Sequence, residues 1–269
     1  MNKLLIATTN KGKIRELHAT LRVDNLGLQL LTPADIGLNL EVEEDGSTYA
    51  ENATKKALAF ARASGLTSLA DDSGLEVDAL DGAPGLFSAR YSAKPGATDA
   101  DRRAYLLENL RGKPRPWKAR FVATVAIAGP EGSVELAEGT CPGEIIPEER
   151  GSGGFGYDPI FFLPELGKTM AELPEETKNH LSHRARAVQA AKPILMSLFN
   201  LYDKLTIVLL PRLIDNRIHK VTQRLSEGLR LFEHHHVTGT RKGDQARARN
   251  MISQIFRIFH RRQRILRAA

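Results

Sequence analysis

Two clusters of acidic residues have the types and spacing that could most directly take part in catalysis. Asp71 is the last of residues 68–71, which are expected to form the end of a buried strand, and Asp72 follows it directly; residues 43–45 form a second cluster. Carboxylates that follow a strand, next to a glycine such as Gly74, can coordinate Mg²⁺ and leave room for water and phosphate oxygens. Either cluster alone could also consist of solvated loop carboxylates and helix caps.

Residues 8–13 place small polar side chains, one glycine and two lysines between an expected strand and an expected helix. A helix N-terminus with free N–H groups and neighbouring ammonium groups can hold phosphate, although a solvated turn with surface lysines is the alternative. The sequence has no G-x-x-x-x-G-K-[ST] loop and no G-x-G-x-x-G after the first strand. A nucleotide enzyme with this sequence therefore has to bind phosphate through a different arrangement of residues.

Four glycines crowd into residues 151–156, a density that a plain turn rarely needs. Phe155 lies among them, and Tyr157 and Asp158 follow directly. An aromatic ring offers a surface for stacking, and a carboxylate or backbone group can bind the edge of a base. We interpret this segment as a base-binding loop.

Three potential cations surround the start of the last predicted helix, namely Lys178, His183 and Arg184. Lysine and arginine bind phosphate or a carbonyl edge, and a histidine can add a hydrogen bond. Ser182 and His183 are adjacent, but neighbouring residues seldom orient as nucleophile and base, so a hydrolase nucleophile is not expected here.

The elements that must position these groups alternate between strands and helices in residues 1–199. Residues 4–8 predict a strand, and the helical spacing of residues 14, 17 and 21 predicts a helix after it. Thr48 with Glu51 matches a capping box ahead of an Ala-rich helix that extends to residue 61.

A hairpin and a final helix are predicted to complete this part of the chain. Residues 119–128 and a strand from residue 133 flank a Gly-Pro-Glu-Gly turn, which indicates a hairpin. Ser182 can cap a helix in which residues 188, 191, 195 and 198 share a face, and Pro193 should kink or restart this helix.

The formal net charge of +6 is unevenly distributed along the 269 residues. Residues 200–269 hold 15 Lys and Arg against 5 Asp and Glu, whereas residues 1–199 carry a net charge of −4. We therefore expect a domain in residues 1–199 and a basic extension in residues 200–269, with an amphipathic helix around residues 252–259. The extension could bind nucleic acid or another anionic surface, pack as a helix on the domain or a partner, or lack a selected function.

Hydropathy and cysteine content favour a cytoplasmic protein. The apolar run at residues 205–210 is far shorter than the roughly 20 residues of a membrane-spanning helix. The N-terminus lacks the long apolar core of a secretory signal. Cys141 is the single cysteine, which excludes an intrachain disulfide and a Cys-rich zinc site and fits a reducing compartment.

Six short motifs of this sequence occur in the order in which they stand in the inosine triphosphate pyrophosphatase family, which the sequence resembles over residues 1–199. Members remove the non-canonical purine nucleotides ITP, dITP and XTP by releasing pyrophosphate. The motifs are residues 8–13, 43–46 with 51–53, 70–75, 82–85 with 88–91, 154–159 and 182–184. The resemblance implies an elongated two-lobed α/β fold with a central mixed sheet, an active-site cleft between the lobes, and a homodimer. Family members normally end soon after the helix that starts at Ser182.

The resemblance also implies the roles of individual residues. Asp72 would be the catalytic proton acceptor and, with Glu44, would hold Mg²⁺, although Glu43 remains an alternative ligand. Ser73 would contact the substrate, residues 155–158 would form the base pocket, and the cations near the last helix would complete recognition of the base and phosphates. The residues expected to bind substrate are Thr8, Thr9, Asn10, Lys11, Gly12, Lys13, Lys56, Ser73, Phe155, Gly156, Tyr157, Asp158, Lys178, His183 and Arg184.

A second hypothesis assigns the protein to a different class. The chain could be an inactive nucleotide- or RNA-binding protein that uses its basic extension. The presence of Asp72, Lys13, His183 and Arg184 argues against it, since an enzyme that has lost its activity tends to lose such residues.

Overall fold

The computed structural model describes residues 2–22, 27–199 and 201. These residues belong to one compact unit that spans Met1–Tyr202. The basic extension lies outside the described residues, apart from Leu201, and so do the helix expected at residues 252–259 and the apolar run at 205–210. Among the described helices, none is both long enough and apolar enough to cross a membrane.

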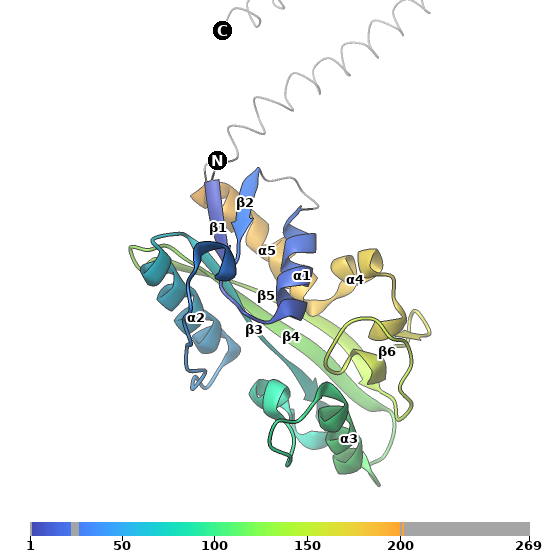
Figure 1. Ribbon diagram of the computed structural model, residues 1–269. Coiled ribbons are helices and arrows are strands. Elements are labelled where there is room, and N and C mark those ends of the chain that lie inside the picture. The colour runs from blue at the N-terminus through green and yellow to red at the C-terminus, as the bar shows by residue number, and fades with distance from the viewer. Residues whose placement is uncertain (1, 23–26, 200, 202–269) are drawn as a thin grey trace, which may run out of the picture. The chain divides into compact units, whose positions relative to one another are not determined.

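A seven-stranded mixed sheet forms the centre of the fold, as expected (Figure 1). Its strand order is β2-β1-β3-β4-β5-β6-β7. The first strand pairs in parallel with β2 and β3, and the pairs from β3 to β7 are antiparallel. The strands are β1 (Asn2–Ile6), β2 (Leu28–Leu31), β3 (Ser68–Val77), β4 (Trp117–Ala128), β5 (Val134–Ile145), β6 (Phe161–Leu163) and β7 (Lys168–Thr169).

Five α-helices and five short 3-10 helices accompany the sheet in the described part of the chain. The α-helices are α1 (Lys11–Arg22), α2 (Tyr49–Ser64), α3 (Asp99–Leu110), α4 (Glu175–Leu181) and α5 (His183–Leu198). The 3-10 helices are η1 (Ala34–Ile36), η2 (Asp78–Leu80), η3 (Gly85–Arg90), η4 (Asp158–Ile160) and η5 (Met170–Glu172). The predicted first strand and helix and the predicted hairpin of β4 and β5 are confirmed.

Two helix caps were predicted, and one of them differs in detail. The Ser182 hydroxyl accepts a hydrogen bond from the N–H of Ala185 at 3.2 Å, as expected for the start of α5. Thr48 caps α2 by accepting from the N–H of Glu51 at 3.1 Å. The Glu51 carboxylate, however, accepts from the N–H of Ser47, so the reciprocal half of the predicted box is absent.

The last helix can be compared with its prediction in two places. It is one continuous element through Pro193, so the helix does not restart there, which was one of the two expected outcomes. Val188, Ala191 and Leu195 are buried on its inner face, whereas Leu198 is 45% exposed. Leu198 is the final residue of α5, so the buried part of the predicted apolar face ends at Leu195.

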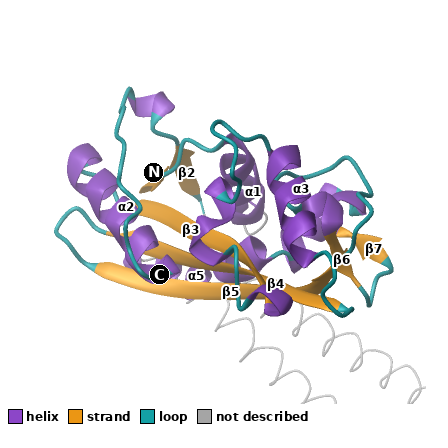
Figure 2. Ribbon diagram, turned by 90° about the horizontal axis from the view of Figure 1, so that it is seen from below, coloured by secondary structure: helices purple, strands orange, loops and turns teal. Residues whose placement is uncertain are grey.

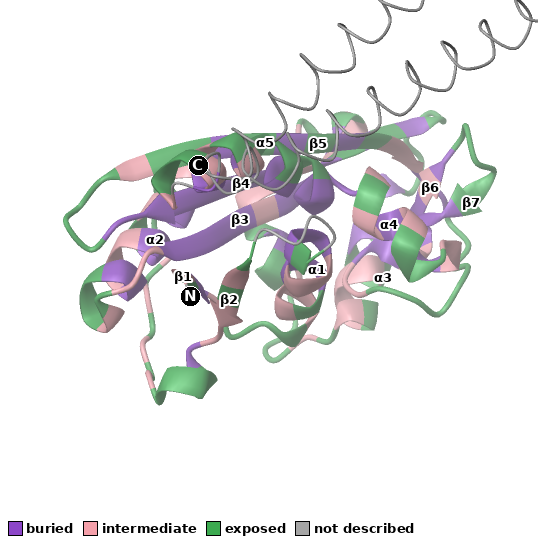
Figure 3. Ribbon diagram, turned by 90° about the horizontal axis from the view of Figure 1, so that it is seen from above, coloured by how far each residue is buried: buried purple, intermediate pink, exposed green. Residues whose placement is uncertain are grey.

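Helices cover both faces of the sheet at the end where β1 lies. The helices α1 and α5 pack on one face through a buried cluster that includes Leu17 and Val188, and α2 packs on the opposite face through Ala53 and Phe60. A third cluster, which includes Leu106 of α3, lies at the other end of the sheet. The β4–β5 hairpin spans both ends (Figure 2), and Figure 3 shows that most of β3 is buried, as is β4 from Ala123 to Ala128.

The length of β3 corrects the predicted end of this strand near Asp71. The parallel partner β1 reaches only as far as the pair Ile6–Leu69, but the antiparallel partner β4 continues to the pair Val77–Ala119. Residues 71–73 therefore lie in the middle of a strand, directly after β1 has ended. Successive residues of a strand face opposite sides, so Asp71 lies on the side of α1 and α5 and Asp72 on the side of α2.

Candidate active site

A cleft of about 540 Å³ lies beside this part of β3. Its walls come from the loop after β1, from α2, and from the segments around α4 and α5. It is lined by every residue predicted to bind substrate or metal, with two exceptions, Lys11 and Gly12. Lys11 is exposed at the first position of α1. The chain thus brings together residues that are up to 176 positions apart, from Thr8 to Arg184.

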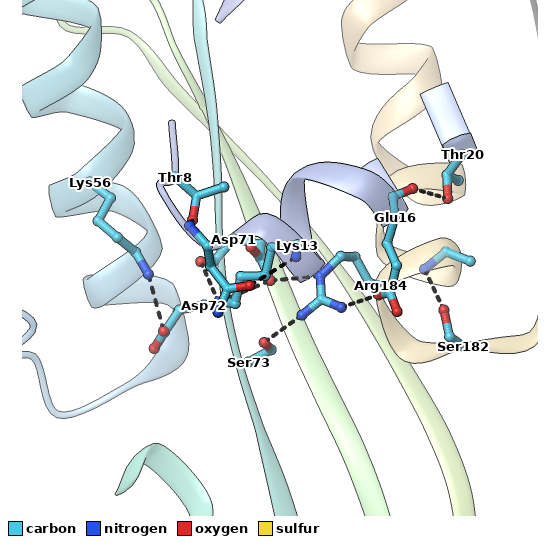
Figure 4. Close-up of polar contacts among 12 residues, drawn as sticks. Thr8, Lys13, Glu16, Thr20, Lys56, Asp71, Asp72, Ser73, Ser182 and Arg184 are labelled. Carbon is cyan, nitrogen blue, oxygen red and sulfur yellow. Dashed lines mark hydrogen bonds and ion pairs between the residues drawn. The ribbon is translucent and has the colours of Figure 1, made fainter. Parts of the chain in front are cut away.

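Asp72 occupies the α2 side of the cleft and contacts two side chains from that helix. The Lys56 ammonium lies 3.2 Å from Asp72 Oδ1, and the Asn52 amide donates to Asp72 Oδ2 at 3.2 Å (Figure 4 shows the Lys56 pair). Burial raises the pKa of Asp72 above its ordinary value, although Lys56 and Lys13 oppose the shift. A carboxylate with a raised pKa is a better proton acceptor than an exposed aspartate.

The same ammonium group joins Asp72 to the acidic loop. Lys56 Nζ lies 2.6 Å from Glu44 Oε1, so one cation bridges two carboxylates. Glu44 is partly buried and lines the cleft, whereas Glu43 is exposed and lies outside the lining. Of the two glutamates that the sequence left as alternatives, Glu44 is therefore the one whose position suits a shared cation.

The donor set of Glu44 and Asp72 fits Mg²⁺. Two carboxylates already face one positive charge here, and Mg²⁺ is usually held by one or two carboxylates together with waters and substrate phosphates. No group of three or more His, Cys, Asp and Glu side chains is placed to hold a metal within the described ranges. The remaining ligands would have to come from the substrate and from water, as that coordination preference allows.

Arg184 occupies the opposite side of the cleft, where it connects three elements (Figure 4). Its Nε donates to Asp71 at 3.0 Å, its Nη2 donates to the Ser73 hydroxyl at 3.0 Å, and its Nη1 donates to Glu16. Each nitrogen of the guanidinium thus has a partner within the protein. Arg184 therefore holds α1 and β3 against the start of α5, in addition to lining the cleft.

Lys178 extends this chain of alternating charges. Its ammonium lies 2.6 Å from both Glu16 and Asp158. Burial would disfavour the charge on Glu16, but Arg184 and Lys178 lower the pKa of this carboxyl to about 2. Burial likewise opposes the charge on Lys178, yet Asp158 and Glu16 raise its pKa. Glu16 and Lys178 are therefore both ionised at neutral pH.

His183 is not the third cation that the sequence suggested. Burial, reinforced by the neighbouring Arg184 charge, lowers its pKa to about 3, so the imidazole is neutral at pH 7. Its ring stacks on Phe121 with centroids 4.7 Å apart. Its Nδ1 is buried, and no hydrogen bond reaches it from the described residues. This side chain can offer a polar atom to a ligand but no charge.

Phe155 presents its ring to the cleft, with two cations near its face. The Lys178 ammonium is 5.2 Å and the Arg184 guanidinium carbon 5.7 Å from the ring centroid. The Asp158 carboxylate accepts a hydrogen bond from the N–H of Phe155 at 2.9 Å, which holds the two ends of residues 155–158 together. A Cβ on Gly12 would lie 2.8 Å from the ring, so this glycine makes room for Phe155 and does not itself line the cleft.

Glu16, Asp71 and Asn52 have roles in the site that were not predicted from the sequence, and Asp99 and Arg102 line the cleft without having been predicted. Glu16 lies three positions after Lys13, and Asn52 four positions before Lys56. Residues at these spacings share one face of a helix. The spacing from Lys13 and from Lys56 was therefore the signal in the sequence that could have placed Glu16 and Asn52 at the site. The pairing of Asp71 with Arg184 had no local signal, because these residues are 113 positions apart.

Comparison with known proteins gives consistent matches. The model of the Ham1 family matches residues 4–194. A dITP/XTP pyrophosphatase of Desulforamulus reducens is 50% identical over 198 residues, which cover 73% of this chain and 97% of the relative. One from Thermus thermophilus is 51% identical over 189 residues, which cover 70% and 89% respectively. The solved structure of a HAM1 protein from Coxiella burnetii has a TM-score of 0.66 and 38% identity, and the match covers 73% of this chain and 100% of that one.

Proposed function

The chain belongs to the Ham1 family, and from that membership we propose that it hydrolyses purine nucleoside triphosphates such as dITP, XTP and ITP to the monophosphate and pyrophosphate. The observation that carries the proposal is the position of Asp72. This carboxylate lies in a cleft between Lys56 on one side and the cationic groups around the Phe155 ring on the other.

The residues of this chain support attack by water on the α-phosphorus. Asp72 takes a proton from the water as the new oxygen–phosphorus bond forms, and the bond from the α-phosphorus to the bridging oxygen breaks, which releases pyrophosphate. Lys13 and Lys56 place positive charge beside the phosphates. Mg²⁺ held by Glu44 and Asp72 would neutralise phosphate charge and lower the pKa of a nearby water.

The base end of the cleft supplies the selectivity. A purine can stack on Phe155, and the Lys178 ammonium near this ring can donate to an oxygen at position 6 of the base. Adenine carries an amino group at this position, so two donors would face each other and one would remain unpaired. The contact favours hypoxanthine and xanthine over adenine, while guanine shares the 6-oxo group.

Release of pyrophosphate from a panel of nucleotides tests the proposal directly. ITP, dITP and XTP should be preferred over ATP by at least about tenfold in kcat/KM, since a mismatched buried polar edge costs about 1–3 kcal/mol. Equal values for ITP and ATP would show that the cleft does not recognise position 6. Addition of a chelator should stop turnover, and Mg²⁺ should restore it.

The substitution Asp72→Asn tests the catalytic assignment. It removes a charged ligand and proton acceptor with little change in volume, so turnover should be abolished while the circular dichroism spectrum is unchanged. Asp45→Asn is the matched control, because Asp45 is exposed, pairs with Lys55 and lies outside the cleft. Near-normal pyrophosphate release by folded Asp72→Asn would remove Asp72 from the mechanism. A wild-type chain that binds ITP and releases no pyrophosphate would favour the inactive binding protein instead.

The homodimer and the cytoplasmic location that the sequence analysis expected remain predictions. Sedimentation of the purified protein would give its mass in solution, and fractionation of cells would give its location.

A further inference from the structure

The loop that carries Phe155 is attached to α3, a helix from a distant part of the chain. The N–H of Gly156 donates to Asp99 Oδ2 at 2.7 Å, and the carbonyl of Gly156 accepts from Arg103 Nη1 at 2.8 Å. Asp99 and Arg103 are four residues apart in the first turns of α3, so they lie on the same helix face. Both polar groups of one loop residue are thus held by one face of α3.

Arg103 also holds the segment that leads into the loop. Its Nε lies 2.8 Å from Glu149 Oε1, and its Nη2 lies 2.9 Å from Glu149 Oε2. This two-point pairing with a carboxylate uses Nε and Nη2 of the planar guanidinium, which leaves Nη1 to donate to the carbonyl of Gly156. A single side chain therefore connects residue 149, the loop at residue 156, and α3.

The helix end that carries Arg103 is itself fixed in place. Thr98 and Asp101 form a complete capping box at the start of α3. Leu106 and Leu110, further along the helix, are fully buried in the cluster at this end of the sheet. A contact with Arg103 therefore ties the loop to a rigid part of the fold.

Arg103 does not line the cleft, and its side chain is only 12% exposed. Its effect on a bound ligand must therefore pass through the residues that it holds, and Gly156 is the one of these that lines the cleft. Phe155 directly precedes this glycine, so the position of the Gly156 peptide sets where the Phe155 ring lies relative to Lys178. A shift of about 1 Å in such a group is enough to weaken binding or turnover strongly.

We propose that Arg103 is a positioning residue for base recognition: it fixes the Gly156 peptide and thereby the Phe155 surface on which the purine stacks. The inference rests on the proposed function for the identity of the substrate. It assigns Arg103 to binding of the base and leaves the chemical step to the α2 side of the cleft.

The substitution Arg103→Lys tests the proposal because it keeps the charge and removes the fork. KM for ITP should rise about tenfold, as expected for loss of charge-assisted hydrogen bonds, while kcat changes less than about twofold. In the ligand-free protein, hydrogen exchange of the peptide that covers residues 151–158 should become faster. Arg120→Lys is the matched control: Arg120 places two nitrogens 2.7 Å from Glu76 but lies on β4, outside the cleft. This control should change neither measurement.

A second variant covers the case in which Arg103→Lys fails to fold. Glu149→Gln alters an exposed partner of Arg103 and weakens only the pairing of Arg103 with residue 149, while the hydrogen bond to Gly156 remains. It should therefore raise KM less than Arg103→Lys does, and it should also accelerate hydrogen exchange in residues 151–158. An unchanged KM in folded Arg103→Lys would overturn the proposal. So would a fall in kcat at constant KM, which is what a smaller active fraction produces. If the wild-type chain released no pyrophosphate from ITP, the proposed function would fail first, whereas normal wild-type turnover with an unchanged variant KM would refute the role of Arg103 alone.

Discussion

Glu16→Gln should remove a large part of the stability of the domain at neutral pH. Glu16 is 5% exposed and lies between the Lys178 ammonium and the Arg184 guanidinium. Its pKa of about 2, in place of the ordinary 4.5, corresponds to about 3 kcal/mol in favour of the folded state. Removal of one partner from a buried ion pair costs about 3–5 kcal/mol in other proteins, which is a similar magnitude.

The loss of stability caused by Glu16→Gln should depend on pH, in a direction set by the lowered pKa of Glu16. A carboxyl whose pKa is lower in the folded state stabilises that state fully above pH 4.5, and the contribution is lost as pH falls through about 2. Glu16→Gln therefore lowers the free energy of unfolding by an amount that depends partly on pH. The pH-dependent part should fall to less than half of its value at pH 7 by about pH 3.

Thermal and urea unfolding of the two proteins, compared at pH 7 and pH 3, is the assay. For a domain of this size, about 3 kcal/mol lowers Tm by about 6–12 °C. Glu175→Gln is the control, because Glu175 forms a surface pair with Arg15 at 3.8 Å and both side chains are more than half exposed. A loss below about 1 kcal/mol at pH 7, or an equal loss at both pH values, would refute the idea that the paired cations stabilise an ionised Glu16.

Three other changes test separate parts of the site. Gly12→Ala should raise KM for ITP several-fold at nearly constant Tm, because its Cβ would displace the Phe155 ring; an unchanged KM would contradict that contact. Asn52→Ala should lower kcat by about tenfold or more, with a smaller change in KM, since Asp72 loses a charged hydrogen bond; equal kinetics would rule out this role. A chain that ends at Tyr202 should fold and keep the wild-type rate of ITP hydrolysis, because every described residue that lines the cleft lies at or before Arg184; loss of activity in a folded chain would mean that the extension contributes to the site.

Local patterns were sufficient to predict many elements of the fold. The spacing around Leu17 predicted α1, the turn after residue 128 predicted the hairpin, and Ser182 predicted the start of α5. The end of β3 could not be predicted in the same way, because a strand continues as long as a partner pairs with it. The partner β4 is about 50 residues away in sequence, and nothing near Asp71 indicates its length.

The membership of the cleft was predicted better than its internal contacts. Half of the lining residues were predicted as site residues, Phe155 and Asp72 among them, since each family motif is a short local segment. The contacts that orient these residues are long-range: Arg184 meets Glu16 and Asp71, and α3 meets Gly156. Such pairings depend on how the layers pack, which no local pattern specifies.

The contact between Glu16 and Arg184 also has a consequence for the order of events during synthesis. The two residues are 168 positions apart, so at about 5–20 residues per second Arg184 is made about 8–34 s after Glu16. During this interval α1 carries a carboxylate that has no cation from α5 to accompany it into the interior, and a lone charge strongly resists burial. The nascent chain is therefore expected to keep this side of α1 hydrated until α5 has been synthesised, so that the nucleotide cleft is completed among the last events of folding.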